Sequence, residues 1–222
     1  MTDPFAFLSP PGAAASGSHA PVLRTPMERA HAAAGATFAE ADGWRVAEYA
    51  GEGGSAWVAD VSHTGKVEAR GPQEELDRAA GASAPGRASF DAGVWTLRIT
   101  AERALALCPF GRVAELRDSL PGAVDMTSAL AAVAIGGAAV RDVFARMSGL
   151  DVRDKSFPDG ACMAGSVARC PAIVLNEGGD RFRILVGWEF GEYLWETALD
   201  AGAPLGIAPV SASVALREEV PA

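Results

Sequence analysis

The chain has 222 residues, of which 49% are hydrophobic and 21% charged, and its formal net charge is −9. A chain of this length can bury a sizeable core, either as one large domain or as two small domains that pack together. The acidic balance and the lack of a concentrated basic face argue against a nucleic-acid partner. The longest apolar run is too short to span a membrane, and the N-terminus does not have the pattern of a secretion signal. We therefore expect a cytoplasmic protein that binds neither nucleic acid nor membrane.

The N-terminal part of the chain predicts an arm followed by a helix. Residues 1–22 are rich in Pro, Gly, Ala and Ser, which indicates a flexible N-terminal arm. A helical composition follows at residues 27–34, where we expect His31 to be solvated. At the other end of the chain, residues 210–222 are expected to form a C-terminal tail or an edge strand.

A twelve-residue segment occurs twice in the chain, at residues 60–71 and again at 125–136. In both copies an acidic, an apolar and a small hydroxyl residue lead into an expected strand, and a Gly follows eleven residues after the acid. Apolar residues at helical spacing come next, at 73–80 in the first copy and at 138–147 in the second. The repeat predicts two pseudo-symmetric lobes. Because only five or six positions agree, chance similarity between two apolar strands is the alternative.

The downstream halves of the two copies also match. Each half has two expected strands and then a helix, at 95–99, 104–108 and 110–120 in the first copy and at 172–175, 182–186 and 190–199 in the second. The second copy contains about thirteen extra residues, which fall in a Gly-rich stretch at 151–170 that is expected to be a loop. These patterns predict an α+β fold with a first lobe at 23–122 and a second lobe at 123–209.

Cysteines and histidines give little sign of metal chemistry. Cys108 lies in an apolar strand and is expected to be a buried apolar residue. The spacing of Cys162 and Cys170 matches no common zinc signature. The chain has three histidines, which are scattered, and we therefore expect no metal site. Only His63, beside a strand and a Gly, has the context of a functional site.

Several motifs resemble those of a known family. RTPMERAH at residues 24–31 and DVSHTGK at residues 60–66 are similar to the opening of the glycine-cleavage T-protein (aminomethyltransferase) family. FPDG at 157–160 and EFGEYLWE at 189–196 resemble the gamma subunit of heterotetrameric sarcosine oxidase, a short member of the same superfamily. The resemblance runs from Arg24 to Ala201. It implies a folate-binding-domain type of fold with two related α+β lobes, here without the family's C-terminal barrel domain.

The chain departs from the family at the three stretches that the resemblance assigns to folate. The family's DDLIVY acids fall on Ala92 and Gly93, which leaves Asp91 one position early and on the opposite face of a strand. The VVNAAN stretch becomes LCPFGR at 107–112, and the GYTGE stretch is shortened to NEGGD at 176–180. Glu177 stands in for the acid of GYTGE or is simply solvated. The resemblance therefore implies that the scaffold is kept and that most of the pocket is lost, so tetrahydrofolate binding by the isolated chain is doubtful.

Any remaining ligand site is expected between the lobes. Its residues would be His63, Thr64 and Lys66 on one side and Asp91 and Glu177 on the other. A histidine near carboxylates titrates in the range needed for proton transfer at neutral pH. The alternative for His63 is a structural role, in which it fixes the turn before the following Gly.

Two functions from different classes are compatible with these patterns. The first is a gamma-subunit-like component of a tetrahydrofolate-linked, amine-oxidising oxidoreductase complex, which packs against larger flavoprotein subunits and contributes surface rather than catalysis. The second is a stand-alone, divergent aminomethyltransferase-like enzyme of one-carbon metabolism, and a weaker third possibility is a ligand-binding or folate-sensing protein. A partner-facing patch is expected on one helix, although the same spacing also suits a core, at Phe190, Tyr193, Leu194 and Trp195.

Overall fold

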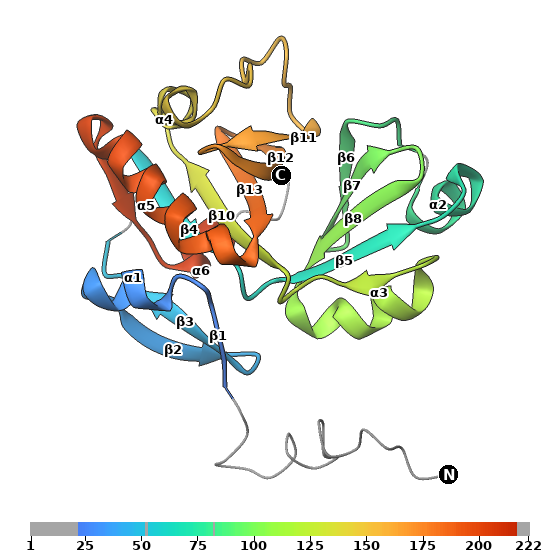
Figure 1. The fold of residues 1–222 in the computed structure, drawn as a ribbon, viewed down its shortest axis with the longest axis horizontal. Coiled ribbons are helices and arrows are strands. Elements are labelled where there is room, and N and C mark those ends of the chain that lie inside the picture. Colours follow the sequence, from blue (N-terminus) through green and yellow to red (C-terminus); the bar gives the residue numbers. More distant parts are fainter. Residues whose placement is uncertain (1–21, 52, 82, 217–222) are drawn as a thin grey trace.

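The computed structural model describes residues 22–51, 53–81 and 83–216. The expected flexible arm therefore lies almost entirely outside the described residues. Three β-sheets form the framework: a small N-terminal sheet and two larger sheets that stand side by side (Figure 1). None of the helices in the described ranges combines the length and apolar character that a membrane crossing requires.

The small sheet precedes the repeat and lies below the two larger sheets in Figure 1. Its strands run in the order β1-β3-β2, and the helix α1 lies between β1 and β2 in the chain. These elements are β1 (Leu23–Arg24), α1 (Glu28–Ala33), β2 (Thr37–Ala41) and β3 (Trp44–Glu48). The β2–β3 hairpin turns at Asp42 and Gly43, whose φ angles of 52° and 78° suit a two-residue turn of type I′.

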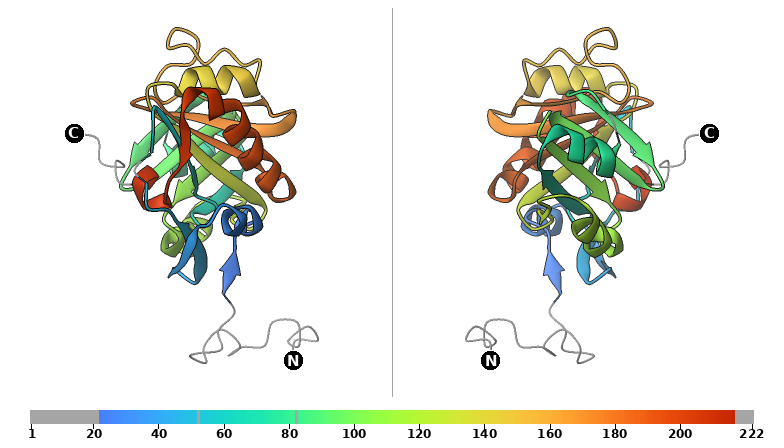
Figure 2. Two further views of the ribbon diagram at one scale, coloured as in Figure 1. Left: turned by 90° about the vertical axis from the view of Figure 1, so that its left-hand side faces the viewer. Right: turned by 90° about the vertical axis from the view of Figure 1, so that its right-hand side faces the viewer.

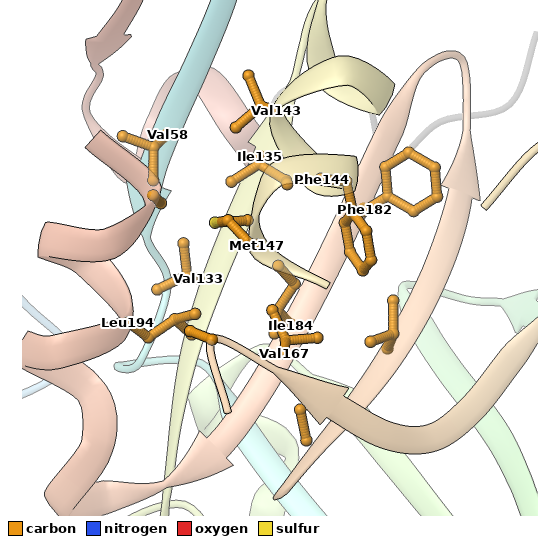
Figure 3. Close-up of a cluster of buried hydrophobic side chains, with 14 of the residues drawn as sticks. Val58, Val133, Ile135, Val143, Phe144, Met147, Val167, Phe182, Ile184 and Leu194 are labelled. Carbon is orange, nitrogen blue, oxygen red and sulfur yellow. The ribbon is translucent and has the colours of Figure 1, made fainter. Parts of the chain in front are cut away.

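The six-stranded sheet carries two helices on its outer face, as Figures 1 and 2 show. Its strand order is β11-β12-β13-β10-β4-β14. These strands are β4 (Ala56–Asp60), β10 (Leu130–Gly136), β11 (Cys162–Val167), β12 (Cys170–Gly178), β13 (Arg181–Gly187) and β14 (Ile207–Pro209). The covering helices are α4 (Val140–Met147) and α5 (Gly191–Gly202). Figure 3 shows the resulting core, in which Phe144 and Met147 of α4 and Leu194 of α5 meet the strand residues Val133 and Ile184.

The five-stranded sheet has the strand order β6-β7-β8-β5-β9. Its strands are β5 (Gly65–Arg70), β6 (Arg87–Asp91), β7 (Val94–Thr100), β8 (Arg103–Cys108) and β9 (Val124–Asp125). Two helices accompany it, α2 (Gln73–Ala80) and α3 (Val113–Ser119). Leu76 of α2 and Val113 of α3 are buried against this sheet, so each helix is held by a small apolar face.

The two copies of the repeat begin in the same way. Asp60 ends β4, and Asp125 ends β9. One carboxylate oxygen of Asp60 accepts the backbone N–H of Ser62 at 2.9 Å, and Asp125 accepts that of Thr127 at 2.8 Å. Such an Asx turn releases the chain from one strand and redirects it into the next.

The repeat also exchanges strands between the two larger sheets. β4 pairs with β10 of the second copy, while β9 pairs with β5 of the first. The outer edges are joined as well, because Ala88 donates its backbone N–H to the carbonyl of Gly160 and Cys162 donates to Gly86. The expected α+β fold with two lobes is thus confirmed, and the lobes are linked by backbone hydrogen bonds that neither could keep alone.

Two expectations for local structure are wrong. The Gly-rich stretch 151–170, expected to be a loop, contains β11, which pairs with β12 across a turn where Ala168 and Arg169 have φ of 50° and 64°. Its alternation is hidden because Gly165 interrupts the pattern. In place of a tail or edge strand after Pro209, the described residues form the short helix α6 (Ala212–Leu216), whereas the edge strand β14 ends at Pro209. Burial of Ala212 and Ala215 between the lobes favours this helix.

Candidate functional site between the lobes

The inner faces of the two larger sheets share a second apolar core. Leu105 and Leu107 of β8 meet Ala132 and Leu185 of the six-stranded sheet there, and Trp44 of β3 closes one side. A cavity of about 250 Å³ remains at the edge of this core. The lining side chains come from five separate parts of the chain: Asp42, His63, Thr64, Cys108, Pro109, Phe110, Arg183 and Leu216.

His63 and Thr64 reach the cavity because a tight turn connects β4 to β5. The backbone N–H and the side-chain hydroxyl of Thr64 both donate to the carbonyl of Val61, at 3.1 and 2.8 Å. His63 is 8% exposed, and its Nδ1 has no hydrogen-bond partner among the described residues. Burial lowers the pKa of His63, so its imidazole is neutral at pH 7. A neutral imidazole can donate one hydrogen bond and accept another.

Lys66 supports this turn from behind and does not line the cavity. Its side chain is fully buried, and Nζ donates to the carbonyls of Ser62 and Thr64, both at 2.8 Å. Burial lowers the pKa of Lys66 to about 7, although the negative charge of Asp60 works in the opposite direction. Lys66, which was expected to belong to the ligand site, therefore stabilises the backbone of the turn that carries His63.

The buried amine predicts a pH dependence of stability. Between pH 7 and 9 the unfolded chain binds more protons at Lys66 than the folded chain, so the free energy of unfolding should rise with pH by roughly 1 kcal/mol per unit. Above pH 9 the raised pKa values of Cys108 and Cys162, both about 11, act in the opposite sense. Urea unfolding at pH 7, 8 and 9 should show this slope, and Lys66→Met should flatten it. An unchanged slope in the variant would contradict the assignment.

Glu177 is neither solvated nor available as a lone carboxylate. It lies in β12 with its side chain 1% exposed. Its carboxylate lies 2.6 Å from Nε of Arg183 and 3.1 Å from a terminal nitrogen of Arg181. Because Arg183 lines the cavity, Glu177 acts on the cavity through this arginine. The short hairpin NEGGD thus ends in a buried ion-pair cluster.

Asp91 is not brought together with the other expected site residues. It ends β6, is exposed, and is absent from the cavity lining. The two positions that follow, Ala92 and Gly93, form a tight turn with φ of 46° and 79°. Arg112 donates to the carbonyl of Ala92 at 2.7 Å, so this corner is occupied by an arginine. The cavity's carboxylate is instead Asp42, in the β2–β3 turn, where the Asp-Gly pair was the available sequence signal.

His31 was expected to be solvated, but the structure buries it. Its side chain is 1% exposed, with Nε2 3.0 Å from Asp60 and Nδ1 2.8 Å from the Tyr49 hydroxyl. Burial alone would raise the pKa of Asp60, but hydrogen bonds from His31, Thr25 and Ser62 outweigh it and leave the pKa lowered. This network ties α1 to the turn that carries His63.

The aromatic helix is divided between surface and core. Phe190 and Tyr193 are exposed by 37% and 47%, whereas Leu194 and Trp195 are buried. Trp195 packs edge-on against His31 with ring centroids 4.5 Å apart. Only Phe190 and Tyr193 can therefore belong to a partner-facing patch. Within the described ranges, no group of three or more His, Cys, Asp or Glu side chains could hold a metal ion.

The two-lobed fold of this chain is similar to that of a solved aminomethyltransferase. The crystal structure of glycine cleavage system aminomethyltransferase T from Bartonella henselae superposes with a TM-score of 0.70 at 20% identity, over 87% of this chain and 60% of that one. Aminomethyltransferases from Frankia alni and Saccharopolyspora erythraea are 28% and 26% identical over 86% of this chain. The chain spans 61% of the length of both relatives.

The second part of the chain also matches a more specific family. The family model of the sarcosine oxidase gamma subunit matches residues 95–204. A chain of the heterotetrameric sarcosine oxidase from Corynebacterium sp. U-96, crystallised in complex with pyrrole 2-carboxylate, superposes with a TM-score of 0.65 at 20% identity. The match covers 84% of this chain and 98% of that one. This protein is therefore similar both to the sarcosine oxidase gamma subunit and to the T-protein, which confirms the resemblance noted from its motifs.

Proposed function

We propose that this protein is a cytoplasmic, gamma-subunit-like component of a tetrahydrofolate-linked, amine-oxidising complex, in which it contributes surface rather than catalysis. The proposal rests on the position of Asp91 and on the ion pairs of Glu177. Asp91 lies outside the cavity, and Glu177 is already bonded to two buried arginines. A pterin presents several polar groups, and each one left without a partner costs about 1–3 kcal/mol. The cavity therefore does not fit a tight pterin site, and we derive no catalytic step through folate.

The runner-up is a stand-alone, divergent, folate-dependent aminomethyltransferase-like enzyme. The Nδ1 of His63 in the cavity wall supports it, because this buried nitrogen has no partner among the described residues and so favours a ligand that supplies one. In that case the ligand would lie between the turn at His63 and Thr64 and the Arg183–Glu177 pair. Lys66 would act indirectly, through the turn.

Co-expression with larger flavoprotein subunits tests the first proposal. We expect a stoichiometric complex in native mass spectrometry, and self-association or poor solubility when the chain is expressed alone, because an uncovered interface exposes apolar surface. Isothermal titration calorimetry of the isolated chain with tetrahydrofolate provides the second measurement. Two unpaired polar groups would weaken binding about a hundredfold. A stable monomer that binds tetrahydrofolate tightly, one to one, would reverse the ranking in favour of the enzyme.

A further inference from the structure

The short helix α6 packs against β3, β4 and β10, on the inner side of the six-stranded sheet. Ala212 and Ala215 belong to the apolar core shared by the inner faces of the sheets. They lie in this core together with the small side chains of Ala132 and Ala134, which leave room for a helix to approach. The last residue of α6, Leu216, lines the same cavity as His63. One lining residue of the cavity thus comes from α6 rather than from a strand of either sheet.

The anchoring of α6 is light compared with that of its surroundings. Before the helix, Val210 donates its backbone N–H to Val58 at 2.9 Å. The hydroxyl of Ser211 accepts the backbone N–H of Tyr49 at 2.8 Å and donates to the carbonyl of Tyr49 at 3.2 Å. Within the helix, the buried side chains are the two alanine methyl groups, while Val214 and Leu216 are half-buried against the same core. The β-strands beneath it, in contrast, are paired on both sides along several residues.

A helix of five residues is far too short to be stable by itself, since isolated helices shorter than about 12–15 residues are marginal in water. Its stability must come from tertiary contacts, and alanine side chains bury little apolar area. Segments with few buried contacts open locally at a lower free energy than core strands. Detachment of α6 therefore needs no disruption of either sheet.

We propose that α6 is a lid over the inter-lobe cavity, which opens by local detachment of residues 212–216 while both sheets remain folded. The inference concerns access to the cavity discussed under the proposed function, but it does not depend on which ligand enters. It gives this chain a means of regulating a site that the sheets alone would leave more open.

The histidines provide a probe that needs no ligand. Diethyl pyrocarbonate acylates neutral imidazole, and peptide mass spectrometry can follow each histidine separately. His63 lines the cavity, so its reaction rate reports opening of the lid. His31 is 1% exposed and bonded to Asp60 and Tyr49 outside the cavity lining, so its rate reports global unfolding. Both are measured in the same sample of the full chain at pH 7.

Two matched variants place the same charge on opposite sides of α6. Ala215→Glu puts a carboxylate into the buried face, whereas Ser213→Glu adds it at an exposed position. We expect Ala215→Glu to raise the His63 rate about tenfold or more by increasing the population of the open lid. Ser213→Glu should leave that rate unchanged, and His31 should stay unreactive in both. Leu216→Ala, which removes only the lining side chain, should give a smaller rise.

Two results would contradict the proposal that α6 is a lid over the cavity. Equal His63 rates in the original chain, Ala215→Glu and Leu216→Ala would show that α6 does not limit access. A parallel rise of His31 in Ala215→Glu would show that α6 unfolds only with the whole domain and is part of its cooperative core. Neither result depends on folate binding or on assembly with other subunits, so failure of the proposed function leaves this test intact.

Discussion

Replacing Asp60 with alanine should lower the free energy of unfolding by about 3–5 kcal/mol, because it leaves a buried histidine without its charged partner and a buried N–H without an acceptor. The carboxylate lies 3.0 Å from Nε2 of His31 and accepts the N–H of Ser62 at 2.9 Å. Urea denaturation at pH 7 measures the change. The loss should be smaller below about pH 4, since a carboxyl with a lowered pKa stabilises the fold only while the unfolded chain's carboxyl is also ionised.

The second copy of the repeat provides the control for this prediction. Asp125 makes the same local bond, to the N–H of Thr127, but it is exposed and the structure shows no histidine beside it within the described ranges. Asp125→Ala should therefore cost only about 1 kcal/mol or less, the net value of one ordinary hydrogen bond. Similar losses for the two variants would mean that His31 adds nothing to the stability and that the turn alone matters.

Replacing Glu177 with alanine should be comparably destabilising, by about 3–5 kcal/mol, because breaking a buried ion pair leaves an uncompensated charge. Its carboxylate is 1% exposed, and the side chains of Arg183 and Arg181 are 3% and 9% exposed. Because Arg183 also lines the cavity, the variant should change the hydrogen exchange of the amides in the turn at His63. Urea unfolding and exchange mass spectrometry provide the two measurements.

An exposed ion pair is the matched control. Asp151 accepts two hydrogen bonds from the guanidinium of Arg153 and one from its backbone N–H, but the arginine side chain is 82% exposed. Solvent screens such a pair, so Asp151→Ala should change the stability little or not at all. If Glu177→Ala lowered the free energy of unfolding as little as Asp151→Ala does, the buried ion-pair cluster would not stabilise the cavity wall.

The sequence alone was sufficient for several local elements of the two lobes, although not for β11 or α6. The expected helix at 73–80 coincides with α2, and the strands expected at 104–108 and 182–186 lie within β8 and β13. The repeated acidic, apolar and hydroxyl residues were also visible, and the structure shows that each acid forms an Asx turn. These features are decided by neighbours in the chain, because apolar spacing selects helix or strand and an Asx turn needs only its own backbone.

The tertiary structure decided which side chains share a site. His31 meets Asp60 only because α1 packs against the end of β4, and Glu177 pairs with Arg183 only because β12 and β13 form a hairpin beside the cavity. The exchange of β4 and β9 between the sheets left no trace in composition or spacing. Burial, ion pairing and cavity shape depend on contacts between distant segments. A pattern along the chain therefore identified His63 as a candidate, but it could not place Leu216 in the lining of the same cavity.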